Sequence, residues 1–92
     1  MNTDWQKKLN ELVAAVKNGS EAGELLKALL TPVEYDEMAK RWQIVCSLME
    51  GMPQRDISSK LGVSIATVTR GSREVKYGNG IFKKIYRRIK NS

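Results

Sequence analysis

The stretch QRDISSKLGVSIATVTRGSREVK, residues 54–76, decides the fold, because it has the pattern of two short amphipathic helices joined by a glycine turn. Ile57 and Leu61 are four residues apart, so they share one face of the first helix. Gly62 can adopt the left-handed backbone of a sharp turn, and Ser64 can cap the helix that follows. The stretch therefore predicts a helix-turn-helix, a motif typical of DNA-binding proteins.

The charge of the chain is concentrated in its second half. Residues 1–51 carry six Lys and Arg against eight Asp and Glu, whereas residues 52–92 carry ten against two. The two halves therefore have net charges of −2 and +8, within a total of +6. A basic half around a predicted helix-turn-helix attracts DNA phosphates, with an affinity that falls as salt rises. A basic helical module that docks on an acidic protein is the alternative from a different class.

The residue inventory argues against several classes of protein. The chain has one cysteine, Cys46, so it cannot form an intramolecular disulfide, and it has no histidine. Transition-metal sites and histidine-based catalysis therefore lack their usual side chains. We expect no catalytic residues, no metal and no enzymatic activity. No apolar run approaches the length of a membrane span, so we expect a cytoplasmic protein without a membrane partner.

The rest of the chain also has helical patterns. Apolar residues at spacings of three and four predict helices over about 5–18, 20–30, 32–50 and 81–90, the second of them capped by Ser20. Thr31 and Glu34 flank Pro32 in the pattern of a capping box, which marks the start of the third helix. We therefore predict an all-α fold of six helices in a single domain over residues 1–92.

The first two predicted helices are short and rich in apolar residues for a chain of 92 residues. Such helices are more easily buried against a second copy than within a small monomer. We therefore predict a homodimer. Two DNA-binding helices related by a twofold axis would enter successive major grooves, about 34 Å apart.

Four segments resemble the Trp repressor family: LLTP (29–32), RWQIV (41–45), GMPQRDI (51–57) and SIATVTRGS (64–72). The resemblance covers about residues 28–76. It implies an intertwined, all-helical dimer that binds a double-stranded operator as a repressor of tryptophan biosynthesis genes. It also implies L-tryptophan as a corepressor, bound between the core and the DNA-binding helices.

The resemblance also implies a set of tryptophan-binding residues, namely Ala28, Leu30, Thr31, Arg41, Arg70, Gly71 and Glu74. Arg41 and Arg70 match the two arginines that flank the indole ring, and Arg70 also pairs with the carboxylate. Thr31 matches a threonine of the other subunit that helps to bind this carboxylate. Ala28 and Leu30 match positions whose backbone carbonyls bind the ammonium group. Gly71 matches a position that permits close approach of the ligand and the DNA backbone.

Three features depart from the family pattern. Glu74 stands where tryptophan-responsive members have a serine, and its carboxylate could bind the ligand ammonium or pair with Arg70 one turn earlier. The hinge at Met52 and Pro53 is one residue shorter than in the family. The segment VKYGNG, residues 75–80, resembles relatives of the Trp repressor whose ligand is not established. A related DNA-binding regulator that does not respond to tryptophan is therefore an alternative.

The candidate DNA-binding residues come from both helices of the motif and are Gln54, Arg55, Ile65, Ala66, Thr67, Thr69, Arg70 and Lys76. Family correspondence and helix geometry place residues 65–67 nearest the base edges. Gln54 and Arg55 begin the preceding helix, where their side chains suit phosphate contacts. Ser58 replaces a basic residue of the family, so one phosphate contact per subunit is expected to be weaker.

Overall fold

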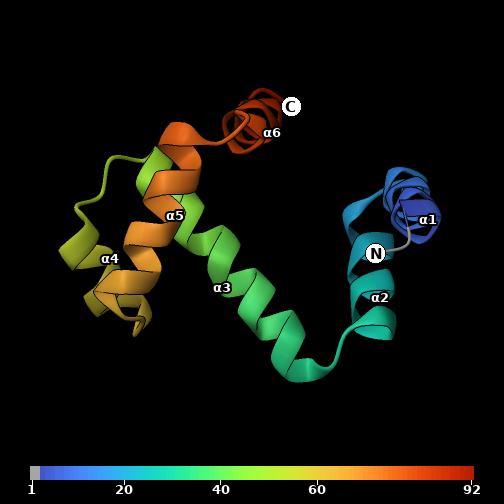
Figure 1. Cartoon of the computed structure of the whole chain (residues 1–92), viewed down its shortest axis with the longest axis horizontal. Coiled ribbons are helices and arrows are strands. Elements are labelled where there is room, and N and C mark those ends of the chain that lie inside the picture. The colour runs from blue at the N-terminus through green and yellow to red at the C-terminus, as the bar shows by residue number, and fades with distance from the viewer. Residues whose placement is uncertain (1–2) are drawn as a thin grey trace. The chain divides into compact units, whose positions relative to one another are not determined.

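The computed structural model describes residues 3–92, which form helices and connecting turns without a strand (Figure 1). The helices are α1 (Thr3–Ala14), α2 (Gly19–Leu29), α3 (Pro32–Met49), α4 (Gln54–Leu61), α5 (Ile65–Tyr77) and α6 (Ile81–Lys90). The prediction of an all-α fold with six helices is confirmed. The chain divides inside α3 into two compact units, one ending at Tyr35 and one spanning Asp36–Ser92. The single domain over residues 1–92 stays a prediction.

The first unit contains α1, α2 and the start of α3, and it has no buried side chain within residues 3–35. The apolar stripe predicted for α1 is present and exposed: Leu9 is 47% exposed and Val13 is 58% exposed. Leu29 at the end of α2 is also exposed. This unit therefore has no hydrophobic core of its own.

The start of α2 differs from the sequence prediction. The amide oxygen of Asn18 accepts a hydrogen bond from the backbone N–H of Glu21 at 2.9 Å, so Asn18 is the N-cap and α2 begins at Gly19. The prediction that Ser20 caps this helix is wrong, because the extended backbone at Asn18 already starts the helix before that serine. The end of α1 at Ala14 is correspondingly earlier than the predicted end near residue 18.

The capping box at the start of α3 is confirmed. The hydroxyl of Thr31 accepts a hydrogen bond from the Glu34 backbone N–H at 3.2 Å, and the Thr31 N–H donates to the Glu34 carboxylate at 2.8 Å. The hydrogen bond from the Thr31 N–H, helped by the Thr31 hydroxyl, favours the charged carboxylate and holds the pKa of Glu34 below its usual value. The helix ends at Met49, close to the predicted position, and Gly51 follows with a positive φ of 84°.

The core of the second unit joins α3, α4 and α5. It is built on Ile44, Ile57 and Val68, of which Ile57 and Val68 are completely buried. Gly71 makes the close contact between α5 and α3, since a Cβ atom at this position would lie 3.1 Å from Cγ2 of Ile44. The absence of a side chain at Gly71 thus allows the middle of α5 to lie close to α3.

The turn between α4 and α5 has the predicted local structure. Gly62 ends α4 in the left-handed region, at a φ of 66° and a ψ of 36°. Ser64 caps α5 by accepting a hydrogen bond from the Thr67 N–H at 3.1 Å. The side chain of Val63 packs against the core, so the turn and the core hold the two helices together.

The last helix contacts α3 through one aromatic pair, while Ile81 and Ile89 of its apolar side are exposed. The rings of Trp42 and Phe82 lie 6.1 Å apart between centroids, tilted by 47°. The cations of α6 are all exposed, namely Lys83, Lys84, Arg87, Arg88 and Lys90. The basic charge predicted for the second half of the chain therefore includes a solvent-facing surface on α6 as well as residues of α4 and α5.

Candidate ligand cavity and DNA-binding helices

A cavity of about 670 Å³ lies within the second unit. Its walls come from α3, α5 and the start of α6, and are formed by Met38, Arg41, Trp42, Ile44, Val45, Thr67, Arg70, Gly71, Glu74 and Phe82. The volume is within the range of about 300–1,000 Å³ that is usual for small-molecule sites. Most of the lining side chains are apolar, so the few polar groups would determine how a ligand is oriented.

The structure brings together four of the residues that the family resemblance assigns to a ligand: Arg41, Arg70, Gly71 and Glu74. The other three belong to the first unit and do not line this cavity, namely Ala28, Leu30 and Thr31. Gly71 has a role in packing as well, because it allows the contact with Ile44. The sequence thus indicates the charged part of the cavity.

The apolar wall of the cavity includes residues that the set of candidate ligand residues lacks. Met38 and Trp42 come from α3 and Phe82 comes from α6. In the sequence these residues belong to apolar helical stripes, which are equally consistent with an ordinary core. Only the arrangement of the helices separates side chains that line a cavity from side chains that fill a core.

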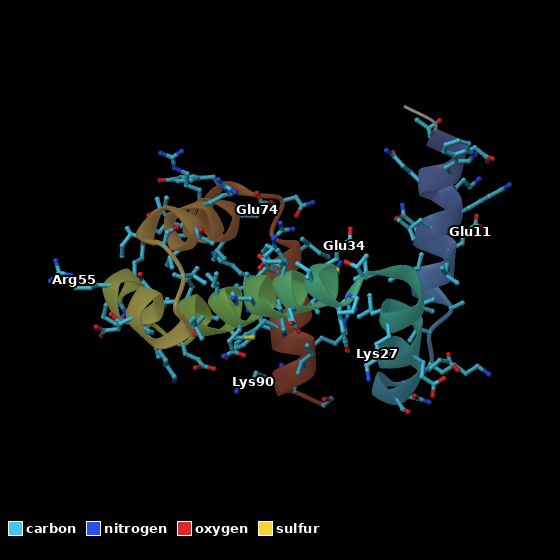
Figure 2. All side chains as sticks on the ribbon, turned by 90° about the horizontal axis from the view of Figure 1, so that it is seen from below. Glu11, Lys27, Glu34, Arg55, Glu74 and Lys90 are labelled. Atoms are coloured by element: carbon cyan, nitrogen blue, oxygen red, sulfur yellow. The ribbon has the colours of Figure 1, made fainter. Side chains whose placement is uncertain are left out.

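Glu74 does not form the predicted alternative pair with Arg70. Within residues 3–92 no ion pair joins the two side chains at 4.0 Å or less. The carboxylate lies instead beside the turn into α6, since a Cβ atom at Gly78 would be 2.5 Å from Oε1 of Glu74. Figure 2 shows Glu74 near the end of α5, next to this turn. The guanidinium of Arg70 is therefore not neutralised by Glu74.

The start of α5 presents the residues predicted to read base edges. Ile65 is 49% exposed and Ala66 is exposed, so both side chains are accessible. Thr67 is half-buried, and its hydroxyl lies 2.8 Å from the hydroxyl of Ser64. Because Thr67 also lines the cavity, it connects the first turn of α5 with the cavity wall.

Two predicted DNA-binding residues are bonded to each other. The hydroxyl of Thr69 donates a hydrogen bond to the amide oxygen of Gln54 at 3.0 Å, which links α5 to the start of α4. Arg55 is exposed and points away from the other helices of its unit (Figure 2). Pro53, which precedes α4, provides no side-chain cap for its first turn. The exposed amides of that turn favour an anion.

Lys76 is exposed in the last turn of α5, about 16 Å along the helix axis from Ile65. It therefore lies far from the side chains at the start of this helix. Arg70 is exposed between them and lines the cavity. The later part of α5 thus carries positive charge away from its first turn.

Ser58 has a structural contact that the sequence comparison with the family does not indicate. Its partly buried hydroxyl donates a hydrogen bond to the carbonyl of Val63, across the turn between α4 and α5. The Val63 N–H in turn donates to the Ser58 carbonyl at 3.2 Å. This residue therefore closes the turn between α4 and α5.

The thiol of Cys46 is free and only partly buried. Burial raises its pKa, and the nearby Glu50 carboxylate raises it further, so the thiol is protonated at neutral pH.

Across residues 3–92, no three side chains of the types that bind metals form a group suited to a metal ion. None of the helices in this range has the length and apolar character needed to cross a membrane.

Comparison with known proteins gives a consistent result. The family model described as Trp repressor protein matches residues 3–90. A Trp operon repressor homolog of Vibrio vulnificus (strain YJ016) is 45% identical over 78 residues, which is 80% of this chain and 72% of that protein. The protein of the same name from Vibrio atlanticus (strain LGP32) is 43% identical over 74 residues, or 79% of this chain and 74% of the relative.

A solved structure has the same fold. It is the crystal structure of a TrpR-like protein from Eubacterium eligens ATCC 27750, with a TM-score of 0.83 and 26% sequence identity. The match covers 90% of this chain and 86% of the other. Together with the family model over nearly the whole chain, these likenesses show that the chain belongs to the Trp repressor family, whose members are repressor-type regulators and not enzymes.

Proposed function

We propose that this protein is a sequence-specific DNA-binding repressor of tryptophan biosynthesis genes. It acts in the cytoplasm as a homodimer, with L-tryptophan as its corepressor. The observation that carries this proposal is the position of Thr67, which lines the cavity and also lies in the first turn of α5. A ligand in the cavity would therefore adjoin the end of the helix that enters the DNA groove.

The DNA-binding part of the proposal uses α4 and α5 as a helix-turn-helix. The exposed side chains of Ile65 and Ala66 suit apolar contact with thymine methyl groups, and the Thr67 hydroxyl suits a hydrogen bond to a base edge. Gln54 and Arg55 bind phosphates at the start of α4. Thr69 supports these contacts by its hydrogen bond to Gln54. Arg70 and Lys76 support them by their positive charge.

The ligand part of the proposal uses the chemistry of the cavity. Arg41 and Arg70 present planar cations that can flank an indole ring. Arg70 can also bind a carboxylate through bidentate hydrogen bonds. Trp42 and Phe82 offer apolar surface to the ring. Glu74 lines the same cavity, so it belongs to the proposed ligand site together with Gly71.

The family resemblance assigns three further ligand contacts, of which that of Thr31 comes from the second subunit. The Thr31 hydroxyl accepts the Glu34 N–H, and its proton can be donated to a carboxylate, either that of Glu34 or that of a ligand. Ala28 is in the last turn of α2, and Leu30 is its C-cap. Carbonyl groups at a helix end lack helical partners, so they suit an ammonium group.

The homodimer is supported by the first unit. No side chain of residues 3–35 is buried, while large apolar residues of α1 and α2 are exposed, including Trp5 and Leu29. Apolar surface of this kind is typically covered by a partner. Sedimentation of the full chain tests this part of the proposal, and a monomer at micromolar concentration would contradict it.

Binding to DNA is tested by fluorescence anisotropy with a duplex from upstream of tryptophan biosynthesis genes and a shuffled duplex of equal length. We expect tighter binding to the natural duplex, a further gain in affinity with L-tryptophan, and a steep loss as salt rises. Equal binding to both duplexes at moderate salt would favour the basic protein-interaction module instead. Preference for the natural duplex without any effect of L-tryptophan would favour a regulator with a different signal.

A further inference from the structure

The cavity contains opposite charges that have no partners. Its ionisable side chains are Arg41, Arg70 and Glu74, and all three are exposed to solvent. In the described chain, none of them takes part in a side-chain hydrogen bond or an ion pair. The other lining residues are apolar, apart from Thr67, whose hydroxyl is already paired with Ser64. Two cations and one anion therefore border the same apolar space.

The separation of Arg70 and Glu74 has a physical cause. The two residues are four positions apart on α5, but the arginine precedes the glutamate, which is the less favourable order for a helical ion pair. Gly78 provides an alternative place for the carboxylate, because the glycine leaves open the space beside Oε1 of Glu74. The negative charge is thus kept on the cavity wall without cancelling the positive charge of Arg70.

We propose that Glu74 makes this cavity selective for zwitterionic α-amino acids with an apolar or aromatic side chain. The ligand carboxylate binds Arg70, its ammonium group binds Glu74, and its side chain lies against the apolar wall that includes Trp42 and Phe82. The inference rests on the proposed function, in which this cavity holds the effector, and it assigns the choice of ligand charge to one residue. Arginines alone would favour any aromatic carboxylic acid, whereas the carboxylate at position 74 adds a requirement for an amine.

The test compares two probes on the full chain by titration calorimetry. L-Tryptophan and indole-3-propionate share the ring and the carboxylate, but only L-tryptophan has the ammonium group. We expect L-tryptophan to bind at least about tenfold more tightly, as a hydrogen bond between charged groups commonly gives. Glu74→Gln should remove most of this ratio by weakening L-tryptophan, while binding of indole-3-propionate is unchanged or tighter. Arg70→Gln should weaken both probes.

Glu50→Gln is the matched control, because it removes an exposed carboxyl of the same unit that does not line the cavity. It should leave the ratio of the two affinities at the wild-type value, and circular dichroism checks that each variant keeps its helices. Equal binding of both probes by the wild-type chain, or an unchanged ratio in Glu74→Gln, would overturn the role of Glu74 while the effector site itself stands. Absence of heat with either probe would overturn the inference together with the ligand part of the proposed function, and the DNA-binding part would still be judged by the duplex experiment.

Discussion

The hydroxyl of Thr69 donates a hydrogen bond to the amide oxygen of Gln54 at 3.0 Å, although the two residues are fifteen positions apart. This bond joins α5 to the first residue of α4. Because the oxygen of the Gln54 amide is occupied, its NH₂ group is the part left to interact with other molecules. A donor is what a phosphate requires, so Thr69 orients Gln54 for the backbone contact proposed for it.

Thr69→Val should weaken DNA binding without changing its sequence preference. The valine keeps the shape of the side chain but cannot donate to Gln54, so the free energy of unfolding should fall by about 1 kcal/mol. Anisotropy with natural and shuffled duplexes should show a similar loss of affinity for both. The same substitution at the exposed Thr3 of α1 is the control. A loss confined to the natural duplex would instead assign Thr69 to base recognition.

Ser58→Ala should destabilise the second unit. The alanine removes the donor to the Val63 carbonyl inside the turn, and we expect the free energy of unfolding to decrease by about 1 kcal/mol in urea denaturation. Ser59→Ala, at the adjacent exposed position, should have little effect. Ser58→Lys restores a cation at the position where the family has one, but it should lose the same stability. A stable lysine variant would show that the turn does not depend on the hydroxyl.

Arg55→Ala and Thr67→Ala should have different effects on DNA binding. Arg55 is exposed and points away from its unit, so its loss should weaken all duplexes alike and flatten the dependence of log affinity on log salt by about 0.9 per phosphate lost. Thr67 is in the first turn of α5, so its loss should reduce the difference between natural and shuffled duplexes. A salt series with both duplexes measures the two effects, and the reverse pattern would exchange the two assignments.

The start of α3 should loosen in acid because of Glu34. The bonds from Thr31 lower the pKa of this carboxyl in the folded chain. Their stabilisation is therefore complete above the unfolded pKa of about 4.3 and is lost as the pH falls through the lower folded value. The protection of the Thr31 amide against hydrogen exchange, relative to its intrinsic rate at each pH, should decrease in this acid range, because this N–H donates to the Glu34 carboxylate. Glu34→Gln keeps an acceptor for the capping box and should remove the pH dependence, whereas Glu37→Gln should retain it.

The helices and most of their boundaries could be predicted, because caps and turns depend on residues close in sequence. Thr31 with Glu34, the left-handed Gly62 and the Ser64 cap are contacts of this local kind. The start of α2 could not be predicted as well, since Asn18 and Ser20 are both good capping residues only two positions apart. Which of them caps the helix depends on where the backbone leaves the extended conformation.

The cavity could be predicted only in part. The resemblance to the family indicates two of its charged residues, Arg41 and Arg70, and both line the cavity. The planar guanidinium group of arginine suits a carboxylate and an aromatic ring. Phe82 lines it only because α6 returns to α3, an arrangement that periodicity does not specify. Spacing alone also left open whether Glu74 pairs with Arg70. In the structure the carboxylate lies beside Gly78, a position that the spacing on α5 does not specify.

The contact between Gly71 and Ile44 has a mechanical consequence. Gly71 is the central residue of α5, six positions from Ile65 and six from Tyr77. If a helix tilts about a contact at its centre, its two ends move in opposite directions. Each half of α5 is about 9 Å long. A tilt of about 10° would therefore move the two ends by about 1.6 Å in opposite directions. Because Gly71 has no side chain, α5 can approach α3 at its centre, so both ends of the helix are equally sensitive to a change of tilt at this contact.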